Sequence, residues 1–129
     1  MTQTIDQKRA TLAWQYATAG MATPYGKEYK VLAKGAPALI MNSGLMPTLA
    51  FYNGKGKAAQ LLLDDLIRGL SQRLASQPLK PGQGAQLFPS FMQELQKGNS
   101  HDYMRHTDEA LELLKWIRQF VDAVEPQGA

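Results

Sequence analysis

The sequence predicts an all-α protein, a compact single-domain bundle of about five to six helices spanning residues 1–129. Leu, Ala and Gln, which favour helix, are frequent. No segment alternates apolar and polar residues long enough for a half-buried strand. The β-branched aliphatic residues that favour strands are few: Val31, Val121, Val124, Ile5, Ile40, Ile67 and Ile117.

The first helix is predicted to start at Thr4, where Thr4 and Gln7 have the spacing of a capping box. The segment from Gly20 to Pro24 is predicted to end it, because glycine and proline disfavour helix. One face of this helix carries the residues expected in the core: Ile5, Leu12, Ala13, Tyr16 and Ala17.

A second helix is predicted from about Tyr25, with apolar residues at helical spacing and lysines on the other side. Its apolar face comprises Tyr25, Tyr29, Leu32 and Ala36, and its polar face Lys27, Lys30 and Lys34. We expect Pro37 to interrupt or kink it and Gly44 to cap the continuation in a left-handed conformation. Pro47 then suits the first turn of a short third helix that ends near Asn53-Gly54.

Residues 58–76 predict a strong fourth helix, in which Asp64 and Arg68 are expected to pair on the outer surface. Prolines and glycines between Gln77 and Gly84 predict an exposed connection, and Ser90 with Gln93 predicts the start of a short helix. We expect residues 77–97 to be a variable connection that includes this short helix. The apolar stripe of the fourth helix comprises Ala59, Leu62, Leu63, Leu66, Leu70 and Leu74.

The last helix is predicted to open near Ser100, and its apolar face is wider than one neighbouring helix can cover. Either this helix is buried among several others, or Leu113, Trp116 and Phe120 contact a second protein chain. We favour burial, because aromatic stripes usually belong to a core. The apolar series is Tyr103, Thr107, Ala110, Leu114, Ile117, Val121 and Val124, widened by Leu111, Leu113, Trp116 and Phe120.

Composition and charge favour a cytoplasmic protein with an anionic partner. Cysteine is absent, which suits a reducing compartment, and the polar segment Met1 to Ala10 predicts no export signal. The longest apolar runs are too short to cross a membrane. Basic residues dominate residues 1–57, where only Asp6 and Glu28 oppose Lys8, Arg9, Lys27, Lys30, Lys34, Lys55 and Lys57. Such asymmetry suggests contact with nucleic acid.

No catalytic residue, metal site or cofactor is predicted. His101 and His106 diverge on a helix and are expected to be solvated or capping side chains. The segment Asn53 to Lys57 lacks the spacing of a P-loop, and is either a basic turn that holds a phosphate or a solvated loop. The adjacent carboxylates Asp64 and Asp65 should point apart on their helix.

Three blocks of sequence together resemble the small all-helical subunit of the CRISPR type III-B RAMP module, the Cmr effector complex. The first block is Gln7-Lys8-Arg9-Ala10. The second runs from Lys27-Glu28-Tyr29 through Leu32-Ala33-Lys34, Pro37, Leu39-Ile40 and Ser43-Gly44-Leu45 to Thr48-Leu49-Ala50-Phe51. The third comprises Tyr103, Arg105, Thr107, Glu109-Ala110-Leu111, Leu114, Trp116-Ile117-Arg118 and Phe120.

The resemblance implies a non-catalytic subunit that stacks in copies of itself, beside other Cmr subunits, the crRNA and the target RNA. On this hypothesis the RNA contacts are sequence-independent and salt-sensitive. They would come from Lys8, Arg9, Lys27, Lys30, Lys34, Lys55 and Lys57. Three alternatives stay open: a lysine face that contacts only solvent, a helical adaptor of another complex without RNA, and a small helical enzyme.

Overall fold

The computed structural model describes residues 2–125, and this part of the chain forms seven helices and no strand. The all-α prediction is confirmed, but the predicted number of five to six helices is too low. Two short helices, rather than one, follow the fourth. The elements are α1 (Ile5–Met21), α2 (Gly26–Ser43), α3 (Leu45–Asn53), α4 (Lys57–Ala75), α5 (Gln83–Gln86), α6 (Phe88–Lys97) and α7 (Ser100–Ala123).

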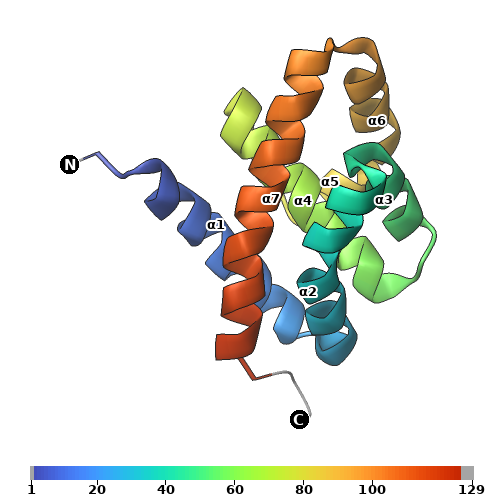
Figure 1. Cartoon of the computed structure of the whole chain (residues 1–129). Coiled ribbons are helices and arrows are strands. Elements are labelled where there is room, and N and C mark those ends of the chain that lie inside the picture. The colour runs from blue at the N-terminus through green and yellow to red at the C-terminus, as the bar shows by residue number, and fades with distance from the viewer. Residues whose placement is uncertain (1, 126–129) are drawn as a thin grey trace.

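The long helices α4 and α7 organise the bundle. Helix α7 runs along one side of the molecule and packs mainly against α1 and α2, while α4 contacts α1, α2, α3, α5 and α7 (Figure 1). Residues from six of the seven helices meet in one buried cluster between these elements. Within residues 2–125, no helix combines the length and apolar character needed to cross a membrane.

The first helix begins as its sequence predicts. Gln7 N donates to Thr4 Oγ1 at 3.0 Å and Thr4 N donates to Gln7 Oε1 at 2.7 Å, which completes a capping box. Ala13, Tyr16 and Ala17 are buried as expected. The prediction for Ile5 is wrong, since its side chain is 56% exposed. The N-terminal end of α1 projects beyond the other helices, which leaves the Ile5 side chain largely exposed (Figure 1).

Helix α2 continues through Pro37 to Ser43, so of the two expected effects of this proline, an interruption or a kink, the interruption does not occur. Gly44 separates α2 from α3 with φ of 96° and ψ of 162°. The positive φ agrees with the predicted role of this glycine, because side chains with a Cβ rarely adopt it. Pro47 lies in the first turn of α3, where its missing N–H removes no helical hydrogen bond.

Two predictions for the following region need correction. Asp64 and Arg68 do not lie on the outer surface of α4, because Asp64 is buried and accepts hydrogen bonds from the turn that opens α5. Ser90 does not start a helix either. Helix α6 already begins at Phe88, with Pro89 in its first turn, and the hydroxyl of Ser90 donates to Leu87 O at 3.0 Å.

Candidate nucleic-acid interface

Three lysines, one in the first turn of α2 and two in the turn that leads from α3 into α4, make no ion pair within residues 2–125. Lys57, the first residue of α4, places its Nζ 5.9 Å from the ring centroid of Tyr25, which lies two residues before Lys27. Lys55 places its Nζ 5.0 Å from the ring centroid of Phe51. All three lysines are exposed, and within residues 2–125 none makes an ion pair. We call Lys27, Lys55 and Lys57 the lysine cluster.

The other two lysines of the predicted α2 stripe are held by an acidic residue of α7. Lys34 Nζ lies 2.9 Å and Lys30 Nζ 3.6 Å from Asp122 Oδ1. The hydrogen bond from Lys34, with the charges of both lysines, holds the pKa of Asp122 below its ordinary value. Lys27 belongs to the same predicted α2 stripe, but it makes no ion pair with Asp122.

Lys8 and Arg9 have different environments although they are neighbours on α1. Lys8 is exposed, whereas Arg9 donates from Nε to Glu109 Oε2 at 2.8 Å and from Nη2 to Glu109 Oε1 at 2.9 Å. Arg73 approaches the same carboxylate at 3.4 Å. Burial opposes ionisation of Glu109, but the two arginines outweigh it and hold its pKa below the ordinary value. Arg9 therefore joins α1 to α7, whereas Lys8 makes no ion pair within residues 2–125.

The three residues proposed for a protein interface differ in exposure. Leu113 of α7 is fully buried against the neighbouring helices, so it cannot belong to an exposed interface. Trp116 and Phe120 are partly buried, and the Phe120 ring packs edge-on against Trp14 of α1 at 5.1 Å between centroids. Trp14 itself is 47% exposed. Trp14, Trp116 and Phe120 thus form an aromatic patch across α1 and α7.

The histidines show local contacts. His106 Nδ1 lies 2.8 Å from the backbone oxygen of Asp102, and its ring packs edge-on against Phe91. In the described part of the chain, no three His, Cys, Asp or Glu side chains lie close enough to hold a metal ion.

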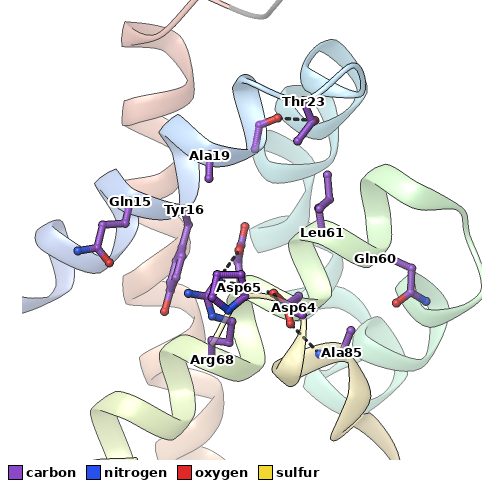
Figure 2. A pocket seen from close by; sticks show the side chains of 13 residues that line it. Gln15, Tyr16, Ala19, Thr23, Gln60, Leu61, Asp64, Asp65, Arg68 and Ala85 are labelled. Atoms are coloured by element: carbon purple, nitrogen blue, oxygen red, sulfur yellow. Dashed lines mark hydrogen bonds and ion pairs between the residues drawn. The ribbon is translucent and has the colours of Figure 1, made fainter. Parts of the chain in front are cut away.

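A cavity that the sequence did not predict lies where α1, α4 and the segment around α5 meet. It has a volume of about 480 Å³, and polar side chains from α1 and α4 reach into an otherwise largely apolar space (Figure 2). Its lining includes Gln15, Tyr16, Gln60, Asp64, Asp65 and Arg68.

The two adjacent carboxylates of this cavity have separate partners. Asp64 accepts from Gly82 N at 3.0 Å and from Ala85 N at 2.8 Å, which fixes α5 against α4. Asp65 Oδ2 accepts from the Tyr29 hydroxyl at 2.6 Å. The sequence held one signal for this site, because both acids interrupt the apolar run of α4 and are therefore close to its buried face.

Burial controls ionisation in this region. Desolvation raises the pKa of Asp65 well above its ordinary value, and the Asp64 charge adds to the rise while Tyr29 and Arg68 oppose it. Desolvation likewise raises the pKa of Tyr16 and Tyr29. Arg68 stacks its guanidinium over the Tyr16 ring, with Cζ 5.1 Å from the centroid.

Known proteins resemble this chain in both sequence and structure. The sequence model of a family described as CRISPR-associated protein (Cas_Cmr5) matches residues 5–124. A curated relative, the CRISPR system Cmr subunit Cmr5 of Thermus thermophilus, is 29% identical over 98 residues, which cover 75% of each chain. An X-ray crystal structure of a CRISPR-associated Cmr5 family protein from the same organism matches with a TM-score of 0.74 and 24% identity. This match covers 95% of this chain and 97% of that one.

Proposed function

Because this chain belongs to the Cas_Cmr5 family of CRISPR-associated proteins, we propose that it is a non-catalytic small subunit of a type III-B CRISPR (Cmr) effector complex. In this role it stacks with copies of itself and with other Cmr subunits beside the crRNA. It supports the binding of crRNA and target RNA in antiviral defence, while base pairing with the guide supplies sequence specificity.

The lysine cluster is the observation that supports RNA contact. Its three amines are exposed and make no ion pair within residues 2–125, and Lys57 and Lys55 each lie near an aromatic ring. Positive side chains that have no acidic partner can neutralise phosphates and release counterions. Lys8 adds a further exposed charge on α1. Lys30 and Lys34 take a smaller part, because Asp122 already partly neutralises them.

The test is RNA affinity of the purified chain measured by fluorescence anisotropy at increasing salt. Replacing Lys27, Lys55 and Lys57 by alanine should weaken binding at low salt and reduce the slope of log K against log salt by about 2, roughly 0.7 per lost phosphate contact. A matched control replaces three exposed basic residues elsewhere, Lys97, Arg105 and Arg118, with the same change in net charge. Equal affinities of the two triple variants would contradict the assignment.

The proposed partners are tested separately. Affinity purification of the tagged chain from its host should recover RAMP-type proteins together with short repeat-derived RNAs. Recovery of an unrelated complex without RNA would instead favour the second candidate function, a helical adaptor. The aromatic patch is the observation behind that candidate, since exposed tryptophan is characteristic of protein interfaces.

A further inference from the structure

The cavity beside Asp65 contains polar groups whose hydrogen-bonding capacity the protein does not use. Asp65 is 7% exposed, and its Oδ1 has no hydrogen-bond donor within residues 2–125. Its nearest cation is Arg68 Nη1 at 3.8 Å, which is beyond hydrogen-bond distance. Among the described residues the one fully enclosed side-chain atom without a hydrogen-bond partner is Trp116 Nε1, so Asp65 Oδ1 is open to the cavity and can accept a further hydrogen bond there.

Arg68 offers donors to the same space. Its Nε donates to Leu79 O at 3.3 Å, and its Nη1 lies 3.6 Å from Asp64 Oδ2. No hydrogen bond from Nη1 or Nη2 is found among the described residues, and the same holds for the hydroxyl of Tyr16. Figure 2 shows the guanidinium between the Tyr16 ring and the two carboxylates. The ring holds this donor plane in place before any ligand arrives.

Charge excludes most kinds of ligand. A free anion would meet the Asp64 carboxylate, and a cation would meet the Arg68 guanidinium. Asp64 is already satisfied by two backbone N–H groups. The cavity therefore suits a neutral, planar group that presents hydrogen-bond donors and acceptors side by side. Its volume of about 480 Å³ lies within the roughly 300–1,000 Å³ of small-molecule sites.

We propose that this cavity binds an unpaired nucleobase, with guanine preferred. Proteins recognise unstacked bases by stacking them on aromatic rings or guanidinium planes and by bonding to their edges. Guanine alone presents two neighbouring acceptors, N7 and O6, which match a guanidinium, together with two neighbouring donors, N1–H and N2–H, which match a carboxyl. Arg68 takes the acceptors and Asp65 Oδ1 takes a donor.

The surroundings of the cavity suit a nucleotide rather than a bare base. Lys57 lies on the same face of α4 as the lining residues Gln60 and Leu61, three and four residues further on. Lys80 precedes the lining residue Pro81. Two lysines therefore lie within one helical turn or one residue of cavity-lining positions, and a phosphate attached to the bound base would be attracted to them. This inference rests on the proposed RNA contact, because Lys57 also belongs to the lysine cluster.

The experiment measures binding of guanosine monophosphate and the three other nucleoside monophosphates by calorimetry. In parallel, anisotropy compares a single-stranded uridine heptamer with one that carries a central guanosine. Guanosine monophosphate should bind at least about tenfold more tightly than uridine monophosphate, in keeping with one bidentate contact. If guanine is preferred both in the oligonucleotide and in the mononucleotide, the ligand of the cavity is RNA. If guanine is preferred only in the mononucleotide, the ligand is a free nucleotide.

Three variants locate the site. Arg68→Lys keeps the charge but loses the planar pair of donors. Asp65→Asn keeps the size of the side chain but changes the carboxyl to an amide. Each substitution should reduce the guanine preference at least about tenfold. Ala19→Trp fills the cavity mouth from an exposed position of α1 and should abolish binding. The control is Ala50→Trp, an equal change at an exposed position of α3 outside the cavity.

The two proposals fail in different ways. RNA binding without any guanine preference, or a preference that Ala19→Trp leaves unchanged, would overturn the base site while the backbone contacts stand. Binding of guanosine monophosphate that is lost in Ala19→Trp, without RNA affinity, would support the base site and contradict the proposed RNA contact. Circular dichroism spectra that match the wild type show that a loss of binding in a variant is not caused by misfolding.

Discussion

The hydroxyl of Tyr29 on α2 donates a 2.6 Å hydrogen bond to the Asp65 carboxyl on α4, in the interior of the bundle. Tyr29 is fully buried, and its ring also lies against Gly20 of α1, where an added Cβ would come within 2.7 Å of it. One tyrosine thus connects three helices, and the position of α2 depends on a carboxyl that is difficult to ionise.

Asp65→Asn should make the free energy of unfolding less dependent on pH. Burial raises the pKa of Asp65 in the folded state, so with rising pH the unfolded chain loses this proton first and wild-type stability falls between the two pKa values. The asparagine variant lacks that loss and should equal or exceed the wild type at neutral pH. Urea denaturation from acid to neutral pH measures this.

Asp64→Asn is the matched control on the neighbouring residue. Both oxygens of Asp64 accept backbone N–H bonds, and an amide would turn an N–H group toward one of these donors. A loss of about 1–3 kcal/mol is expected. Similar destabilisation by both substitutions at neutral pH would contradict the difference between the two carboxyls.

Arg9→Ala should destabilise the protein by about 1–3 kcal/mol, because the buried Glu109 carboxylate loses its bidentate partner. The adjacent Lys8→Ala should change stability by less than about 0.5 kcal/mol. The pKa of Glu109 is lowered in the folded state, so its stabilising contribution is present above the unfolded pKa and lost as pH falls through the folded pKa. The difference between Arg9→Ala and wild type, measured by urea denaturation, should therefore narrow in acid.

Asp122→Asn should strengthen RNA binding severalfold at low salt. The substitution removes the carboxylate that holds Lys30 and Lys34 and leaves two free amines for phosphates. Asp108→Asn changes the net charge equally at an exposed position of α7 that makes no ion pair within residues 2–125. If both variants gain equally in anisotropy titrations, net charge rather than the released lysines explains the effect.

Leu113→Ala and Phe120→Ala should have different effects, because Leu113 lies in the core and Phe120 lies partly on the surface of α7. Leu113 is fully buried, and its truncation should cost about 2–5 kcal/mol in the free energy of unfolding. Phe120 is partly exposed, and its truncation should cost less but weaken any association through the aromatic patch. Denaturation curves and sedimentation velocity measure the two effects. Unchanged sedimentation across a concentration series of wild type and Phe120→Ala would argue against that patch as an interface between copies.

Local signals in the sequence were sufficient for most helix boundaries. The capping box at Thr4 and the glycine at position 44 act within a few residues of the chain, so they predicted the start of α1 and the end of α2 correctly. Local rules were insufficient at Pro37, which does not interrupt α2, and at Ser90, which does not start α6. A helix tolerates proline when packing holds it, and Pro89 allowed α6 to begin before Ser90.

The sequence by itself determined the all-helical class and the three blocks that carry the family resemblance, because helical periodicity and residue identity are properties of the chain. Only the tertiary structure decided what each charge does. Lys27 and Lys34 look equivalent on a helical projection, yet Asp122 reaches only the second. Asp64 was expected on the outer surface and pointing away from Asp65, yet both carboxyls are buried and line the same cavity. The burial and ionisation of these groups depend on partners that are distant in sequence. A local sequence pattern cannot predict which distant residues fold against a given side chain.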